Sequence, residues 1–386
     1  MTHTPKILID GLPLFSGHKN RGIGIFSKNL IENISASNNL FDIKILVPST
    51  YADEYFLNLR VERIFIWPKS KNLYLITNQL VIPLILIMKR YDLFHSFEPT
   101  SIIYSKTKRI MMVYDTIKSV MPNEYKQGPI GKILGKLLDI SLKYSDHIIT
   151  ISENSKKDIL KYYNIEHDKI SVVYGAVGPE FHIKKNTEEE IRSLKIKYEI
   201  NGKYVIYVGN YVSPDKRKNV PLLLNIVEKY NNEHNDLLLL VLVGKVGPYS
   251  TKLRKDILER NITSFVRFTD FINDQDLSLL LSSAECLVFP SLYEGLGLPL
   301  IEAMACGLPI IAFANSSIIE VVGDSGLLVK NKDEDIFYDM LTTLLQNDTL
   351  KEELHNRGLK KAAQYSWSNS TNNVLDIYGK ILSTNA

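Results

Sequence analysis

The feature that most constrains the fold is an alternation of short apolar runs with longer amphipathic stretches. Helical patterns such as "GIFSKNLIENI" and "SKKDILKYY" separate several of these runs. Runs of this length and composition are typical of strands buried on both faces, so the pattern predicts a parallel sheet with helices on both sides. In the first part of the chain the runs are "KILID" (6–10), "DIKILV" (42–47), "RIFIW" (63–67), "DLFHS" (92–96), "RIMMVYD" (109–115), "HIITIS" (147–152) and "ISVVYG" (170–175).

The same alternation begins again after a charged stretch at 183–202, which we interpret as a linker merging into a solvated helix. The later runs are "YVIYVG" (204–209), "LLLLVLVG" (237–244), "SFVRFTD" (264–270), "CLVFPS" (286–291) and "LPIIAF" (308–313). The chain is therefore predicted to be an α/β protein with two doubly wound domains in tandem. Ligands of open parallel sheets lie beyond the carboxyl ends of the strands, so we expect the two sheets to face a central cleft.

Composition excludes several classes of protein. The net charge of +3 is too small to predict a nucleic-acid partner, although residues 1–180 hold 23 Lys and Arg against 17 Asp and Glu, a surplus that suits an anionic partner. Two cysteines and no metal-ligand spacing predict no metal site. The N-terminus does not resemble a signal peptide, and the longest apolar run, at 80–88, is too short to span a membrane. We expect a cytoplasmic protein.

The stretch "YEGLGLPLIEAMACGLP" (293–309) joins a predicted strand to a helix that begins near Pro299. Its glycines let the backbone approach a ligand, and the start of the helix offers free N–H groups to negative charge. Glu294 falls on the loop and Glu302 in the first helical turn, where carboxylates can accept hydrogen bonds from vicinal hydroxyls. Each glutamate alone is also explained by dipole complementation or capping. Together with the glycines they predict a site built from Glu294, Gly295, Leu296, Gly297, Leu298 and Glu302.

The segment "PSLYEGLGLPLIEAMACGLPIIA" resembles the nucleotide-sugar signature of the retaining GT-B glycosyltransferases of family 4, whose hallmark is two glutamates with seven residues between them. Other segments follow in the family's order: "NRGIGIFSKNLI", "MVYDTIKSVMPNEY", "DHIITISENSKKDI" and "YVGNYVSPDKRKNV". The resemblance covers nearly the whole chain. It implies an acceptor-binding domain at 1–182, a donor-binding domain at 183–365 and, at 366–386, a last helix that crosses back to the first domain.

The resemblance also implies roles for residues of the second domain. Glu302 would hold the ribose of the donor, and Glu294 with neighbouring backbone N–H groups would hold the transferred sugar. Lys218 and Arg217 would neutralise the diphosphate, which gains charge as the glycosidic bond breaks, and fixed cations can do this without a metal. A basic turn such as "DKRKNV" is often only solvated, but its position after a predicted strand favours this role. Asn219 is expected to cap the next helix.

Residues of the first domain complete the expected site. Gly22 and Gly24, placed before a helix, would let backbone N–H groups reach the diphosphate. The family usually has histidine before the aspartate of the "MVYDTIK" segment, whereas this chain has Tyr114 and Asp115; we therefore assign to Asp115, with Glu294 and Lys218, a catalytic role. An ordinary turn residue is the alternative for Asp115. A second departure is Asn210, where many members have arginine.

The segment "YKQGPIGKILGKLLDISLKY" (125–144) has the pattern of a basic amphipathic helix. Ile133, Leu137, Ile140 and Tyr144 share one face, and lysines lie beside it. Such a helix either rests on anionic lipid headgroups or packs on its own sheet. Both interpretations remain open from the sequence.

The expected activity is transfer of a hexose from a nucleoside diphosphate sugar to a hydroxyl of a growing, lipid-linked bacterial surface glycan such as O-antigen or lipopolysaccharide, with retention and without a cofactor. Mannose from GDP-mannose is the first expectation; UDP- and TDP-sugars are alternatives. A non-catalytic, glycosyltransferase-like binding protein and a nicotinamide-dependent oxidoreductase or epimerase are the other classes. The latter lacks the dinucleotide fingerprint, because the third glycine position is Ser27.

Overall fold

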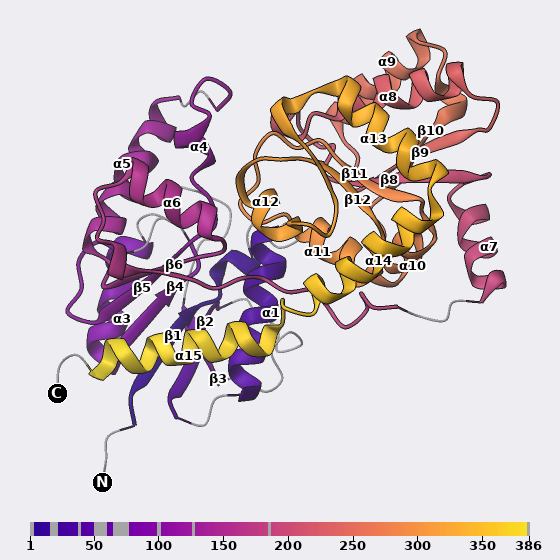
Figure 1. Cartoon of the computed structure of the whole chain (residues 1–386). Helices are drawn as coiled ribbons and strands as arrows, with labels where there is room; N and C mark the ends of the chain where they lie inside the picture. Colours follow the sequence, from indigo (N-terminus) through magenta and orange to yellow (C-terminus); the bar gives the residue numbers. More distant parts are fainter. Residues whose placement is uncertain are drawn as a thin grey trace. The chain divides into compact units, whose positions relative to one another are not determined.

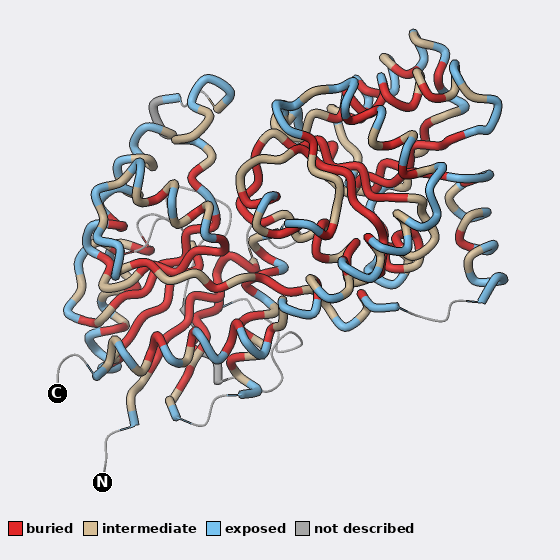
Figure 2. The backbone as a smooth tube through the Cα atoms, viewed as in Figure 1, coloured by how far each residue is buried: buried red, intermediate tan, exposed pale blue. Residues whose placement is uncertain are grey.

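The computed structural model describes residues 4–15, 22–37, 40–49, 60–64, 77–98, 102–125, 128–183 and 187–383. The chain forms two compact units, one of Met1–Ala176 with Ser366–Ala386 and the other of Val177–Tyr365. Each unit is a parallel sheet between layers of helices (Figure 1). In both units the strands form the buried layer, and exposed positions lie on the outer turns of the helices (Figure 2).

The sheet of the first unit has the strand order β3-β2-β1-β4-β5-β6-β7, and every pair of neighbours is parallel. Its strands are β1 (Lys6–Asp10), β2 (Asp42–Pro48), β3 (Arg60–Ile64), β4 (Leu93–Ser96), β5 (Lys108–Val113), β6 (His147–Thr150) and β7 (Ile170–Val172). Its helices are η1 (Leu12–Phe15), α1 (Gly22–Ser37), η2 (Thr77–Val81), α3 (Ile82–Lys89), α4 (Ile117–Val120), α5 (Pro129–Tyr144), α6 (Glu153–Tyr162), η3 (His167–Lys169) and α15 (Trp367–Ser383).

Helices α3 and α5 cover the same face of this sheet. Phe94 of β4 is paired with Arg109 of β5, and because side chains alternate along a strand, Met111 lies on the face of Phe94. Phe94 belongs to a core cluster with Ile82 of α3, and Met111 to one with Leu142 of α5. The two clusters therefore form one continuous layer.

The other face of this sheet carries α1 and α15. His95, which follows Phe94 and so points the opposite way, meets Tyr378 of α15 with Nδ1 and Oη 2.6 Å apart. The rings of Phe26 in α1 and Trp367 at the start of α15 lie edge to face, with centroids 5.5 Å apart. These buried contacts fix the last helix of the chain on the first unit, where Figure 1 draws it in yellow.

The sheet of the second unit has the order β10-β9-β8-β11-β12-β13, again with parallel neighbours. Its strands are β8 (Lys203–Val208), β9 (Leu238–Val243), β10 (Val266–Asp270), β11 (Cys286–Phe289), β12 (Ile310–Phe313) and β13 (Leu327–Val329). Its helices are α7 (Glu188–Lys197), η4 (Lys216–Lys218), α8 (Val220–Glu233), α9 (Pro248–Glu259), η5 (Thr263–Phe265), α10 (Asp274–Ser283), α11 (Leu298–Ala305), α12 (Ser316–Val322), η6 (Lys330–Lys332), α13 (Glu334–Gln346) and α14 (Asp348–Ala362). The chain order reverses beside β8, which lies between β9 and β11, and the loops after β8 and β11 leave the same edge of the sheet there.

The α/β architecture predicted from the apolar runs is confirmed, and two details differ. The strand expected at 63–67 is β3 at Arg60–Ile64, and the rest of the expected run lies outside the described residues. Strand β13 was not expected, because "LLV" is too short to stand out as an apolar run. Across the described residues, no helix is both long enough and apolar enough to cross a bilayer.

Candidate active site

Two loops of the second unit meet at the carboxyl edge of its sheet. One follows β8 and ends in the short helix η4; the other joins β11 to α11. The N–H of Leu292 donates to the carbonyl of Arg217 over 2.7 Å, which ties the loops together directly. The sequence predicted a role for both loops, and the structure brings them into contact.

Glu294 is the centre of this contact. It is only 6% exposed, and both of its carboxylate oxygens accept from cations: Lys218 Nζ is 2.6 Å from Oε1, and Arg217 Nη1 is 2.7 Å from Oε2. Burial acts to raise the pKa of Glu294, but the charges of Lys218 and Arg217 outweigh it and hold the pKa below its usual value. Glu294 is therefore ionised near neutral pH.

Arg217 is itself fixed by several acceptors. Its Nη2 lies 2.9 Å from Asp215 Oδ2, and its Nη1 also donates to the carbonyl of Tyr293 over 3.1 Å. Asp215, which the sequence analysis did not single out, thus orients the guanidinium toward Glu294. The ordered pair of cations beside a carboxylate gives a site that can exchange one anion for another.

The start of α11 supplies the second element of the site. Gly297 has φ 89° and ψ 58°, and a Cβ there would lie 2.9 Å from Leu300 Cδ1, so the position requires glycine. Among the described residues, no acceptor takes the N–H groups of Leu296, Gly297 or Leu298. Free N–H groups at a helix start favour bound negative charge or sugar oxygens.

Residues at the start of α12 hold the Glu294 loop in shape. The N–H of Glu294 donates to Ser316 Oγ over 2.8 Å. Ser317 Oγ donates to the carbonyls of Glu294 and Leu296 over 2.9 and 3.1 Å, and Asn315 Nδ2 to that of Ser291 over 2.8 Å. The sequence analysis missed these supports, although the polar run "NSS" directly after the predicted strand "LPIIAF" was a signal for them.

Glu302 lies one turn into α11 rather than in its first turn, which corrects the expected position because the helix begins at Leu298. Its side chain is half-buried and makes no hydrogen bond or ion pair with any described residue. Burial and, second, the charge of Asp274 raise its pKa to about 8. At pH 7 the group is mostly protonated, and the ionised form, which can accept hydrogen bonds from both hydroxyls of a vicinal pair, becomes the main one above about pH 8.

Comparison with known proteins follows the same division of the chain. Residues 21–181 match "Glycosyltransferase Family 4" and residues 188–364 match "Glycosyl transferases group 1". The chain is 30% identical over 275 residues to O-antigen chain mannosyltransferase B of Escherichia coli, covering 71% of each protein. The chain belongs to glycosyltransferase family 4.

Two further similarities fit this assignment. This glycosyltransferase is 27% identical over 279 residues to the serotype-specific mannosyltransferase WbdA of Escherichia coli, a match that spans 71% of the present chain and 34% of WbdA. Its fold is similar to sucrose-phosphate synthase from Thermosynechococcus elongatus, with a TM-score of 0.76, 17% identity and coverage of 99% and 100%. The GT-B fold expected from the sequence is therefore confirmed.

The first unit of this glycosyltransferase places its expected residues as follows. Gly22 and Gly24 lie in the first turn of α1, not before it, because the helix begins at Gly22. Asp115 is exposed just beyond β5, and its Oδ1 accepts from the N–H of Ile117 over 3.1 Å. These positions are compatible with ligand contact, and their roles toward a donor remain proposals.

Tyr114 has a different environment from its neighbour. It is 4% exposed, and its Oη lies 2.8 Å from Ser27 Oγ of α1. Burial, more than the hydrogen bond to Ser27 that opposes it, raises its pKa well above the usual value for tyrosine. In this glycosyltransferase Tyr114 therefore joins β5 to α1 and stays protonated near neutral pH.

Asn219 corrects another expectation. It stands before α8 with φ 50°, and its side chain makes no capping hydrogen bond. Asp215 instead caps η4, accepting from the N–H of Arg217. The acidic runs at 274–276 and 333–335 lie at helix starts, with Asn273 and Asp333 as the caps of α10 and α13.

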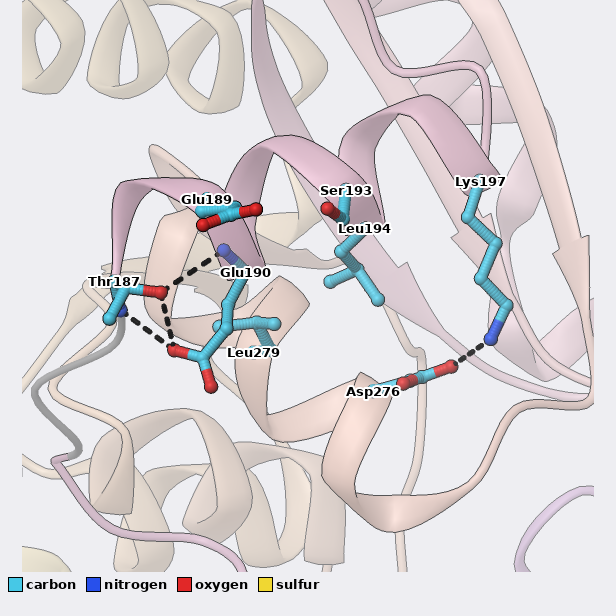
Figure 3. Close-up of a pocket in the computed structure, with 8 residues that line it drawn as sticks. All are labelled: Thr187, Glu189, Glu190, Ser193, Leu194, Lys197, Asp276 and Leu279. Atoms are coloured by element: carbon cyan, nitrogen blue, oxygen red, sulfur yellow. Dashed lines mark hydrogen bonds and ion pairs between the residues drawn. The ribbon is translucent and has the colours of Figure 1, made fainter.

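A depression of about 520 Å³ lies between α7 and α10, away from the Glu294 loop (Figure 3). Four of its polar side chains satisfy one another: Thr187 and Glu190 form a capping box, and Lys197 Nζ is 2.6 Å from Asp276 Oδ2. The other two polar side chains on its wall, Glu189 and Ser193, are exposed to solvent, so the depression is an open surface feature. Among the described residues, no three side chains of His, Cys, Asp or Glu gather as a metal site.

Proposed function

We propose that this glycosyltransferase transfers mannose from GDP-mannose to a hydroxyl of a growing, lipid-linked surface glycan, with retention of anomeric configuration and without a metal. The observation that carries the proposal is the convergence of Lys218 and Arg217 on Glu294, beside the free N–H groups at the start of α11. The activities after which the relatives are named, those of an O-antigen chain mannosyltransferase and a serotype-specific mannosyltransferase, support mannose and a surface glycan.

The chemistry follows from the charges. When the glycosidic bond of the donor breaks, the sugar gains positive character and the diphosphate gains a negative charge. Lys218 and Arg217 stabilise that leaving group, because fixed cations in a partly buried site need no reorganisation at the moment of reaction. Once the diphosphate occupies Lys218 and Arg217, the carboxylate of Glu294 can accept hydrogen bonds from the hydroxyls of the sugar. Glu302 would contact the ribose.

The acceptor is proposed to be held by the first unit, with Asp115 near the reacting hydroxyl. Gly22 and Gly24 would direct N–H groups of the first turn of α1 toward the diphosphate. The neutralising role of the two cations makes a divalent metal unnecessary in this scheme.

The experiment is a transfer assay with GDP-mannose, UDP-glucose, UDP-galactose, UDP-N-acetylglucosamine and TDP-rhamnose, each with purified protein, a lipid-linked glycan acceptor and excess EDTA. We expect transfer from GDP-mannose alone, and an axially linked product by NMR. Transfer from a UDP- or TDP-sugar would show that the donor is that sugar nucleotide and not GDP-mannose. Transfer that requires Mg²⁺ or Mn²⁺ would contradict the metal-independent scheme, and donor binding without transfer or hydrolysis would favour a binding protein.

A further inference from the structure

The outward face of α5 is not covered by the rest of the protein. The helix packs on the sheet through Leu138 and Leu142. Ile133, Ile140 and Tyr144 are 57%, 38% and 53% exposed. These residues share one helical face, and Lys132, Lys136 and Lys143 are exposed beside them. The apolar stripe recognised in the sequence is therefore a surface feature, and the helix packs through a different face.

Helix α3 and the end of η2 carry a second apolar stripe. Leu80, Leu84, Ile87 and Met88 are 67%, 56%, 58% and 72% exposed. Their spacing of i, i+4, i+7 and i+8 places them on one side of a helix. Ile82 and Leu86 on the opposite side are buried against β1, β2 and β4. Helix α3 thus has an exposed apolar side as well as a buried one.

The two stripes lie on the same side of the first unit. Both helices cover the sheet face that carries Phe94, Arg109 and Met111. Arg109 links the segment before β5 to α5, because its guanidinium donates to the carbonyls of Ile102 and Ile103 and to that of Tyr144 at the end of α5.

The segment between the two helices adds to this surface. The N–H of Ile103 donates to Gln79 Oε1 of η2 over 3.0 Å, which fixes the segment on the α3 side. The next residue, Tyr104, is 80% exposed. We call the surface formed by η2, α3, residues 102–106 and α5 the apolar-basic face.

The charge on this face is mostly positive. Its elements hold a single acidic residue, Asp139. The buried carboxylate of Glu62 accepts from Lys89 across the edge of the face. The cations on these elements are Lys89, Lys106, Lys132, Lys136 and Lys143, and Arg90 follows α3 directly. Exposed apolar stripes among lysines match the interface of an anionic bilayer, where apolar side chains enter the acyl boundary and cations meet the headgroups.

We propose that the apolar-basic face docks this glycosyltransferase on an anionic lipid bilayer. A symmetric second copy of the chain fits less well, because an isologous dimer would place the positively charged face of one copy against the same face of the other. The inference goes beyond the proposed function, since it uses no residue of the donor site.

The test is sedimentation of the full chain with vesicles of phosphatidylcholine alone and of phosphatidylcholine with phosphatidylglycerol. We expect binding only to the anionic vesicles, weakening as ionic strength rises. The variant Lys132→Gln/Lys136→Gln/Lys143→Gln should bind on the order of a hundredfold more weakly, since each cation near an anionic surface contributes about fivefold. Leu84→Ser/Ile87→Ser should also lose binding.

Matched controls come from the second unit. Lys252→Gln/Lys255→Gln/Lys360→Gln removes the same charge from exposed helical positions, and Ile196→Ser/Leu258→Ser removes two side chains that are each 67% exposed. Both controls should bind vesicles as the unaltered protein does. Stabilisation by a nucleoside diphosphate should be unchanged in all four variants, which separates this proposal from the proposed function and confirms folding.

Three results would overturn the proposal. The first is no binding of the unaltered protein to anionic vesicles at low salt, and the second is that the lysine and serine variants of the face bind these vesicles as tightly as the unaltered protein does. The third is concentration-dependent self-association that Leu84→Ser/Ile87→Ser abolishes while vesicle binding persists. The last result would assign the face to a second copy of the chain.

Discussion

Lys218 Nζ lies 2.6 Å from Glu294 Oε1. The cation expected to face the diphosphate is thus held by the carboxylate expected to face the sugar, and both side chains are largely buried. Without a donor, each satisfies the other and avoids the cost of a buried unpaired charge. A donor that brings its own negative charge can take over Lys218 and leave Glu294 for the sugar hydroxyls.

Replacement of Glu294 should separate binding from transfer. We expect Glu294→Gln to lower transfer by at least about a hundredfold, because a neutral amide cannot stabilise the developing positive charge on the sugar. Affinity for the nucleoside diphosphate alone should hold or increase, since Lys218 and Arg217 lose a competing anion. Calorimetry and a transfer assay on the same sample measure both. Transfer at the unaltered rate would remove Glu294 from the mechanism.

Lys218 can be compared with an adjacent lysine. Lys218→Met should weaken binding of the nucleoside diphosphate by roughly tenfold to a hundredfold, the range of a charge-assisted contact worth about 1.5–3 kcal/mol. Lys216→Met, at an exposed position of the same short helix, should change affinity by less than about threefold. Equal losses in the two variants would indicate general electrostatic attraction and no specific contact.

The raised pKa of Glu302 predicts a pH effect on donor binding. With a pKa of about 8 in the free protein, roughly a tenth of the molecules carry the ionised form at pH 7. If the carboxylate accepts hydrogen bonds from both ribose hydroxyls, the affinity for the donor should increase about tenfold as pH rises from 7 to 9, because the fraction of molecules with ionised Glu302 approaches one. In Glu302→Gln this increase should be absent. The observation that both proteins show the same pH profile would place the titrating group elsewhere.

The pair Tyr114 and Asp115 should respond in opposite ways. Tyr114→Phe removes the hydrogen bond to Ser27, whose hydroxyl still donates to the carbonyl of Ile23 over 2.8 Å, so the free energy of unfolding should fall by about 1 kcal/mol with transfer kept within a few-fold. Asp115→Asn, at an exposed position, should leave the melting temperature nearly unchanged and lower transfer by at least about tenfold. The reverse pattern would make Tyr114 the functional residue.

Asp10 predicts a stability profile. This residue is 1% exposed, and burial, only partly offset by the N–H of Leu12, raises its pKa to about 7. Because the folded pKa exceeds the unfolded one, its contribution to stability is full below about pH 4 and is lost as pH rises through 7. Asp10→Asn should therefore melt several degrees higher than the unaltered protein at pH 8.5, and the difference should shrink at pH 5. A constant difference across this range would contradict the buried-acid assignment.

The sequence predicted the elements whose structure is determined by the residue types within them. Strands such as β9, apolar along its whole length, and the loop before α11, with Gly297 at positive φ and Pro299 in the first turn, are encoded by residue type alone. The two glutamates and the two cations could be identified as a site because each follows a strand at the same sheet edge.

The parts that could not be predicted depend on contacts between distant segments. Nothing near Lys218 in the chain shows that its partner is Glu294, and nothing near Glu294 shows that Ser316 and Ser317 hold its loop. The burial of Tyr114 depends on Ser27 of α1. The packing face of α5 was also ambiguous, because the helix has apolar residues on more than one side. Leu138 and Leu142 form the buried side because they pack on the strands of the sheet.

The most direct test of the donor site is a thermal-shift panel with GDP, UDP, TDP, CMP and NAD, without added metal, on the unaltered protein and on Lys218→Met. A ligand at a hundred times its dissociation constant adds about 2.7 kcal/mol to the free energy of unfolding. We predict that one nucleoside diphosphate raises the melting temperature of the unaltered protein and that Lys218→Met loses most of this shift at the same concentration. The absence of a shift with every nucleotide, or a full shift in Lys218→Met, would contradict the assignment of the Glu294 loop as a nucleotide-sugar site.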